Sequence, residues 1–452
     1  MKTTERKQLL TRSLVIIILA ILFMGSAGFT LGQADQLEIK LTKQEKTQVV
    51  DSITRFMADK YVFPDMGKKM GDLVTQNLKN GAYENISNPG DFAAKLTEDL
   101  RTVNNDRHIG VQFNPEYIAM MKKANADENN KELEEYEKRR SEYSNYNFKE
   151  VRILPGNVGY LKFNSFQDAS LAGPTAIAAM NFLAHTDALI IDLTDNGGGS
   201  PSLIQLITTY FFEEPEHLNS FYIREGDKTE QFWTLPYVPG PKMIKTDIYV
   251  LTSGYTFSGA EEFTYNLKNL KRATIVGETT GGGAHPVDMH IINDNFGISI
   301  PFGRAVNPIT NTNWEGTGVE PDVKVARDKA METAYMLALE KRLEKEEDKE
   351  IRQSVEWTIN GLKAKQNPVK IDEKTLKLYV GVYGPRKITL ENGELYYQRE
   401  NRPKMKMVPM KEDLFMFDDI DYFRVKFIKE GNKVVALEGN YDNGRTDRND
   451  KS

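Results

Sequence analysis

Three short, near-continuous apolar runs constrain the fold of this chain more than any other feature. They cover residues 188–193, 248–251 and 273–276. A strand that is buried on both faces has this composition, and such strands belong to parallel sheets. Because helical stretches lie between the runs, the pattern predicts an α/β domain with a largely parallel sheet over residues 150–329.

The regions on either side of this domain have different patterns. Residues 35–120 carry apolar side chains at helical spacing and predict a small helical cap domain, which a charged connector at 121–149 follows. Residues 330–368 predict a charged helical spacer. In residues 369–446 the apolar period changes to two, which predicts a small antiparallel β-meander or barrel. Residues 447–452 are polar, and we expect a loose tail.

The N-terminus resembles an export signal. Four basic residues precede an apolar run that starts at Leu14, and small residues follow near Ala27 and Ala34. This order predicts a secretory signal over residues 1–34, cleaved after either alanine, and hence a periplasmic, secreted or cell-envelope protein. The alternative is an uncleaved membrane anchor, although the run is short for a bilayer span.

Composition excludes several functions. The chain has no cysteine, so disulfides, thiolate metal sites and a cysteine nucleophile are excluded. Its formal net charge is -6 with both signs interspersed, which argues against a nucleic-acid partner. No His-Glu-x-x-His or comparable cluster is present, so we expect neither a metal nor another cofactor.

Glycine-rich turns follow the three predicted strands, at the strand ends where ligands bind in such sheets. The first turn contains Gly198 and Gly199, whose amides could hold an anion, although a tight structural turn explains them equally well. The third turn ends at His285, and a lone loop histidine is usually solvated and idle.

The second turn carries Ser258, where a strand ends and a helix begins. Ser258 followed by Glu261 is a capping-box pattern, which would explain both residues without catalysis. Equally, a serine at a helix N-terminus can act as a nucleophile, with the amide of Gly259 facing a substrate carbonyl. The pattern alone leaves both interpretations open.

Taken in order, these segments resemble the serine peptidases that include C-terminal processing peptidases, the tricorn core protease and interphotoreceptor retinoid-binding protein. The matching segments are Ile191-Asp192-Leu193 before Gly198-Gly199, Thr256-Phe257-Ser258-Gly259-Ala260-Glu261, Ile275-Val276-Gly277-Glu278-Thr279 and Trp314-Glu315-Gly316-Thr317-Gly318. The resemblance implies a ClpP/crotonase-like α/β core acting on peptides or proteins through an acyl-enzyme. No segment resembles the PDZ module of many processing peptidases.

The resemblance also implies roles for particular residues. Ser258 is the expected nucleophile. Processing peptidases use a lysine at the position that Gly283 holds here, so the closer match is the tricorn and retinoid-binding subgroup. That subgroup implies His108 as the base and Glu315 as the residue that orients it, with the oxyanion held by Gly259 and by Gly198 or its neighbour Gly199.

Two other functions share these residues. The retinoid-binding branch implies a non-catalytic binder of hydrophobic small molecules, and an esterase would use the same catalytic groups. If His108 is the base, we expect activity to rise with pH through roughly 6 to 7, near the imidazole pKa.

Overall fold

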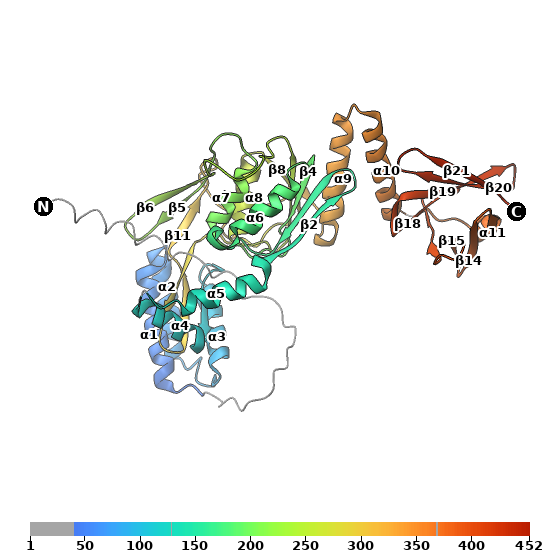
Figure 1. Ribbon diagram of the computed structural model, residues 1–452. Coiled ribbons are helices and arrows are strands. Elements are labelled where there is room, and N and C mark those ends of the chain that lie inside the picture. The colour runs from blue at the N-terminus through green and yellow to red at the C-terminus, as the bar shows by residue number, and fades with distance from the viewer. Residues whose placement is uncertain (1–39, 128, 368) are drawn as a thin grey trace. The chain divides into compact units, whose positions relative to one another are not determined.

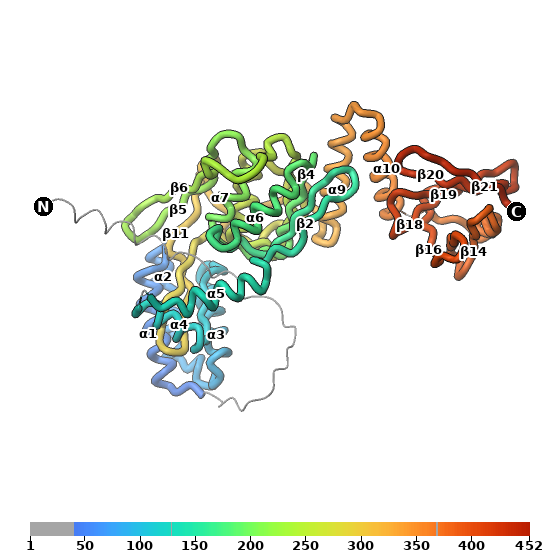
Figure 2. Tube along the Cα trace, viewed as in Figure 1, coloured from blue at the N-terminus to red at the C-terminus, as the bar shows by residue number. Residues whose placement is uncertain are grey.

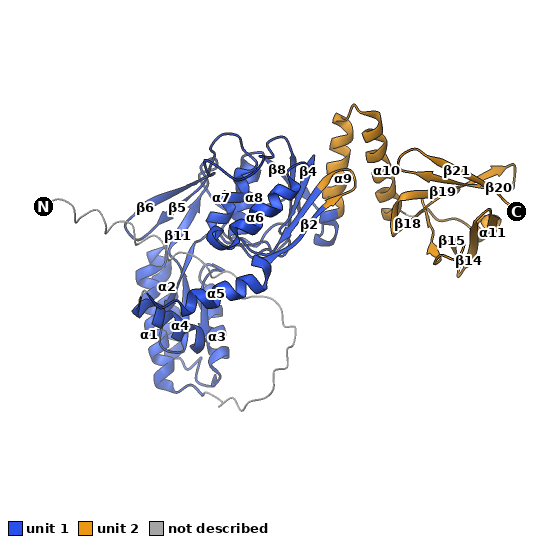
Figure 3. Cartoon of the chain, in the orientation of Figure 1, with its two compact units in different colours: residues 1–152, 159–331 blue, residues 153–158, 332–452 orange. Residues whose placement is uncertain are grey.

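The computed structural model describes residues 40–127, 129–367 and 369–452 (Figure 1). These residues form two compact units, one built from residues up to 152 with 159–331 and the other from 153–158 with 332–452 (Figure 3). The predicted signal at residues 1–34 lies outside the described residues. Across the ranges that are described, no helix combines the length and the apolar character needed to cross a bilayer.

The first unit opens with a cap domain. Its N-terminal helix is fixed by a capping box, in which Thr42 and Glu45 bond each other's backbone amides. The cap is not purely helical, because its short strand β1 pairs with β10, and β10 pairs with β9, both from far along the chain. The elements are α1 (Lys43–Lys60), α2 (Pro64–Lys79), α3 (Pro89–Arg101), β1 (Gly110–Phe113), α4 (Pro115–Ala126), α5 (Glu132–Tyr143), η1 (Asn145–Asn147), β9 (Val287–Ile291) and β10 (Phe296–Pro301).

One apolar core joins the cap helices to this small sheet. Phe92 and Leu96 on α3 pack with Phe296 and Ile298 on β10, all fully or almost fully buried. The cap core is therefore made by two segments of chain that the α/β domain separates.

The α/β domain contains a six-stranded sheet in the order β12-β8-β7-β4-β3-β2. The three apolar runs are its central strands β4, β7 and β8, as the sequence predicts. These three strands and β12 are mutually parallel. Helices α6, α7 and α8 cover it and share its main core. The bounds are β2 (Phe148–Leu154), β3 (Val158–Phe163), α6 (Ala169–Leu183), β4 (Ala188–Asp192), α7 (Pro201–Thr209), β7 (Asp247–Thr252), α8 (Gly259–Asn269), β8 (Ala273–Gly277) and β12 (Val323–Lys324).

A second small sheet lies next to this domain and has the order β11-β5-β6. Its strands are β5 (His217–Ile223), β6 (Lys228–Trp233) and β11 (Gly303–Val306), which the sequence analysis did not identify. Phe221 of β5 packs in a small apolar cluster with Trp314, which comes from the loop between β11 and β12. This cluster forms one wall of the site described below.

The second unit contains helices followed by antiparallel sheets, as Figure 2 shows along the Cα trace. The sheets have the orders β13-β14-β15-β16 and β17-β18-β19-β20-β21. The tail, expected to be loose from residue 447, instead supplies β21, which pairs with β20 because its backbone completes the sheet edge. The elements are α9 (Arg327–Lys345), α10 (Lys349–Gln366), α11 (Glu373–Tyr379), β13 (Gly381–Tyr383), β14 (Arg386–Glu391), β15 (Glu394–Arg399), β16 (Met405–Lys406), β17 (Val408–Pro409), β18 (Leu414–Phe417), β19 (Ile420–Glu430), β20 (Lys433–Tyr441) and β21 (Thr446–Asp450).

Candidate active site

Ser258 stands at the turn between β7 and α8, at the carboxyl edge of the parallel sheet. Its backbone has φ 53° and ψ -121°. A non-glycine residue adopts such dihedrals at a cost of about 1–3 kcal/mol, and residues of this kind gather at functional sites. A sharp strand-to-helix turn of this type holds a nucleophilic side chain out from the end of a sheet.

Glu261 fixes this turn from inside. Its carboxylate accepts hydrogen bonds from the backbone N–H of Ser258 at 2.9 Å and from the amides of Gly282 and Gly283 at 2.7 and 2.8 Å. Burial raises the pKa of Glu261 to about 7, although these hydrogen bonds and one from Thr280 oppose the rise. The capping interaction expected from the sequence is therefore part of a larger anchor that joins the second and third glycine-rich turns.

His108 lies in the loop between α3 and β1 of the cap, and its Nε2 is 3.0 Å from the Ser258 Oγ. The Phe257 ring packs against the imidazole with centroids 4.7 Å apart. Burial lowers the pKa of His108 to about 4, so the ring is neutral at pH 7. A neutral imidazole in contact with a hydroxyl can accept its proton.

Asp106 is the acidic residue nearest to the base. Its Oδ1 accepts the backbone N–H of His108 at 3.0 Å and lies 3.8 Å from the His108 Nδ1, which has no hydrogen-bond partner among the residues described. Its Oδ2 accepts the Tyr61 hydroxyl at 2.9 Å and lies 2.7 Å from the His285 Nδ1. Burial opposes ionisation, but His285 and the other partners hold the pKa of Asp106 below its usual range.

His285 thus belongs to the site, contrary to the expectation that it is solvated and idle. It is 4% exposed. Burial lowers the pKa of His285, but the hydrogen bond and charge of Asp106 outweigh this and raise it overall. Sequence reasoning assigned no role to Asp106 and expected none for His285. The one usable signal was that Asp106 stands two residues before His108, a spacing at which its side chain can cap the turn.

Glu315 contacts His285 rather than the predicted base. Its Oε2 accepts the Ala284 amide at 2.6 Å and is 3.5 Å from the His285 Nδ1. Burial and the nearby charge of Asp106 raise the pKa of Glu315 to about 7, with His285 opposing. Ligand atoms of Asp106, His108 and Glu315 all lie within 4.8 Å of one another, so this set could hold a metal ion.

The glycines beside Ser258 differ in what their amides do. The Gly198 amide donates to the Asn196 Oδ1 at 2.9 Å, so it is already occupied. The amides of Gly199 and Gly259 donate to no acceptor among the described residues. These two lie close together, because a Cβ on Gly259 would be 2.9 Å from the Gly199 nitrogen. They are therefore the better placed pair to hold an oxyanion.

Gly283 is closely covered by the base. A Cβ at this position would lie 2.6 Å from the His108 Cε1 and 2.3 Å from the Phe257 Cζ. No side chain fits there while His108 occupies its place. The histidine of the cap thus fills the space into which a lysine at position 283 would extend.

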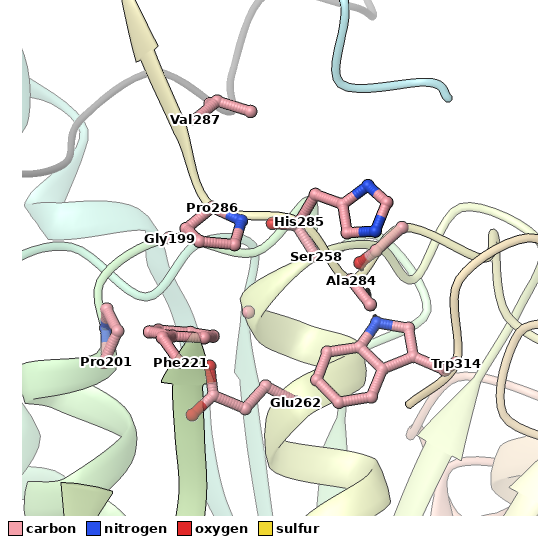
Figure 4. Close-up of a pocket in the computed structure, with 12 residues that line it drawn as sticks. Gly199, Pro201, Phe221, Ser258, Glu262, Ala284, His285, Pro286, Val287 and Trp314 are labelled. Carbon is pink, nitrogen blue, oxygen red and sulfur yellow. Dashed lines mark hydrogen bonds between the residues drawn. The ribbon is translucent and has the colours of Figure 1, made fainter. Parts of the chain in front are cut away.

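A cavity of about 50 Å³ opens beside Ser258 (Figure 4). Its walls include Phe221, Glu262, Ala284 and Trp314, with Gly199 and Gly259 near the nucleophile. The indole N–H of Trp314 donates to the Gly283 carbonyl at 2.7 Å, which fixes this wall to the third turn.

A parallel sheet that presents a strained serine bonded to a histidine is the arrangement of an α/β serine hydrolase. Residues 157–325 match peptidase family S41, and residues 33–151 match the N-terminal domain of peptidase S41 in eukaryotic IRBP. Residues 157–325 are therefore a domain of peptidase family S41, a family of serine peptidases, and a matching N-terminal domain precedes it. The resemblance found in the glycine-rich turns is confirmed.

Individual relatives match over parts of their length. Carboxyl-terminal-processing peptidases 2 and 1 of Arabidopsis thaliana, both chloroplastic, are 27% and 26% identical over 191 and 172 residues. The chain spans 33% of each relative, and each match covers 37% of this chain. A solved photosystem II D1 C-terminal processing protease is 14% identical with a TM-score of 0.40, over 64% of this chain and 94% of its own.

Proposed function

We propose that this chain is an exported serine endopeptidase or carboxyl-terminal processing-type peptidase that cleaves peptides or proteins through an acyl-enzyme on Ser258. The observation that carries the proposal is the 3.0 Å contact between the Ser258 Oγ and the Nε2 of a neutral His108. Export rests on the composition of residues 1–34.

The proposed reaction has two halves. The Ser258 Oγ attacks the scissile carbonyl carbon while His108 takes the hydroxyl proton, and the carbonyl oxygen becomes an oxyanion at the amides of Gly199 and Gly259. When the C–N bond breaks, His108 returns that proton to the leaving amine. Water then attacks the ester, again giving a proton to His108, which passes it back to the Ser258 oxygen as the acid leaves.

Asp106 is the proposed positioning residue for the base. If His108 accepts the serine proton on Nε2, its Nδ1 carries the other proton, and Asp106 is the carboxylate 3.8 Å away. Catalytic hydrogen bonds are often long before substrate binds, so this contact can shorten in the complex. His285 and Tyr61 hold the other oxygen of Asp106, and Glu315 contacts His285.

The alternative of a hydrophobic small-molecule binder fits this cavity less well. An apolar cavity of ~150 Å³ holds one benzene molecule, so a space of about 50 Å³ is too small for a retinoid-sized ligand. An esterase would share the catalytic groups, and it is distinguished by substrate rather than by geometry.

Labelling with a fluorophosphonate probe tests the proposal. Wild-type protein should react at Ser258, whereas Ser258→Ala should not react, and His108→Ala should react much more slowly because the serine has lost its base. Peptide and simple ester substrates are assayed in parallel. A folded protein that takes up no label and cleaves no peptide would refute the peptidase proposal, and cleavage of esters alone would favour an esterase.

The part of the second unit that follows α9, residues 348–452, is proposed to be dispensable for cleavage of short peptides. Its sheets enclose a core of their own, which includes Tyr379, Phe415 and Phe427. All the groups named in the proposed reaction belong to the first unit. A chain ending after residue 347, between α9 and α10, should hydrolyse a short peptide at the wild-type rate, and loss of activity in a folded truncation would contradict this.

A further inference from the structure

The cavity beside Ser258 contains one feature that the proposed reaction does not use, the carboxyl group of Glu262. Glu262 lies one helical turn after Ser258 on α8, and its backbone N–H donates to the Ser258 carbonyl at 2.9 Å. Both residues line the cavity. Figure 4 shows the Glu262 carboxyl directed toward Phe221, which lines the cavity with it.

This carboxyl is buried and lacks a counter-charge. Glu262 is 3% exposed and forms no ion pair within the described part of the chain. Burial raises the pKa of Glu262 to about 8. Hydrogen bonds from the side chains of Asn219 and Asn266 oppose this rise by smaller amounts. At pH 7 the group is therefore mainly a neutral carboxylic acid, which can both donate and accept a hydrogen bond.

Two buried asparagines accompany it. Asn266 follows Glu262 by another helical turn on α8, and Asn219 shares the face of β5 that carries Phe221, because strand side chains alternate. Both side chains are 0% exposed. Each is close enough to Glu262 to lower its pKa through a hydrogen bond, and their amide atoms have no other partner among the described residues. Buried polar atoms are nearly always satisfied, so this group has hydrogen-bonding capacity available to a ligand or to water.

The position of the cavity identifies the part of the substrate that enters it. The proposed oxyanion donors Gly199 and Gly259 line it together with Ser258. A carbonyl held by these groups belongs to the residue on the acyl side of the scissile bond, so the side chain of that residue, P1, is the one next to the cavity. By comparison with a cavity of ~150 Å³ that holds benzene, the available space of about 50 Å³ accepts roughly two heavy atoms, which limits the pocket to small side chains.

We propose that this cavity is the P1 pocket and that Glu262, backed by Asn219 and Asn266, selects small hydroxyl-bearing P1 side chains, threonine or serine, over apolar ones of equal size. This inference rests on the proposed peptidase function and adds a substrate class to it. A pocket built to hydrogen-bond a substrate hydroxyl rejects the analogue without one, because its buried polar groups are then left unpaired. Large and long side chains are excluded by volume.

The test compares two fluorogenic peptides that differ only in threonine or valine at P1, which are nearly equal in shape. Wild-type protein should favour threonine by at least tenfold in kcat/KM. Glu262→Met should remove this preference while still cleaving the valine peptide, and Glu262→Gln should keep threonine ahead because an amide can still bond the hydroxyl. A variant that merely loosened the fold would lower both rates together and leave their ratio unchanged.

Thr264→Val is the matched control, since Thr264 is fully buried on the same helix and does not line the cavity. It should keep the wild-type ratio. Wild-type protein that cleaves both peptides equally, or prefers valine, overturns the inference and leaves the peptidase proposal intact. Failure of fluorophosphonate labelling together with failure to cleave any peptide refutes both. If Glu262→Met does not fold, the ratio of kcat/KM for the threonine and valine peptides is measured for wild-type protein and for Glu262→Gln, and these two ratios test the inference.

Discussion

Replacing Gly283 with alanine adds one methyl group at a place where two rings already lie. The new Cβ would be 2.6 Å from the His108 Cε1 and 2.3 to 2.5 Å from two carbons of the Phe257 ring. Carbon atoms in contact normally sit about 3.5–4.0 Å apart, so the rings must move by about 1 Å or more. The clash falls on Cε1, the ring atom bonded to the Nε2 that faces the Ser258 Oγ.

A displacement of that size breaks the 3.0 Å contact between His108 and Ser258. General base catalysis contributes about 10²–10⁴-fold to rate, so kcat/KM of Gly283→Ala should fall by at least about a hundredfold. Overpacking costs about 1–3 kcal/mol of unfolding free energy, which leaves the protein folded at 25 °C. Peptide hydrolysis and urea unfolding measure the two effects separately.

Gly254→Ala is the control for this variant. Gly254 lies in the neighbouring turn after β7, and a Cβ there would meet no atom within 4 Å. It should keep wild-type activity and stability. If Gly283→Ala is also fully active, the close packing of His108 over position 283 does not hold in solution, and the explanation for the missing lysine fails with it.

The remaining predictions concern the groups of the site. Ser258→Ala and Ser258→Gly should both be inactive. In urea unfolding, the free energy of unfolding of Ser258→Gly should exceed that of Ser258→Ala by about 1 kcal/mol, because glycine tolerates the strained backbone. Equal stability of the two variants would argue against strain. His108→Ala should lower kcat/KM by about 10²–10⁴-fold and His285→Ala by less, since His285 acts only through Asp106; the reverse order would make His285 the base. Because the active form of His108 is neutral and burial lowers its pKa to about 4, wild-type kcat/KM should hold level as pH falls through 6 and decline only toward pH 4, with circular dichroism as the check on folding. A clear decline between pH 7 and 6 in folded protein would contradict this. Zn²⁺ should inhibit reversibly by binding Asp106, His108 and Glu315, with activity restored by a chelator, and Glu315→Gln should weaken the inhibition; Zn²⁺ without effect would exclude that site.

The sequence was most informative where local pattern and burial coincide. The strands β4, β7 and β8 are buried on both faces and stand out as apolar runs. Ser258 remained ambiguous on pattern alone, because a helix N-terminus favours serine as a cap and as a nucleophile alike. Its φ of 53° supports the proposed role of nucleophile, and backbone strain is invisible in a sequence.

Contacts between distant residues account for what the sequence did not predict. Asp106 and His285 are 179 positions apart and meet at 2.7 Å, a contact that no local pattern encodes. The pKa of His108 is lowered by burial, which depends on the packing of the cap, so the expected rise in activity through pH 6 to 7 moves to lower pH. Glu315 was expected to orient His108, and its contact with His285 depends on where the last loop lies.

The pairing of β1 with β10 makes the proposed base depend on a segment that is synthesised after the proposed nucleophile. His108 directly precedes β1, and β10 is made only after Ser258 and the glycine-rich turns have left the ribosome. Until residues 296–301 emerge, β1 lacks its neighbour and the cap core lacks Phe296 and Ile298. On the proposed mechanism, a nascent chain would therefore carry its nucleophile before its base is in place.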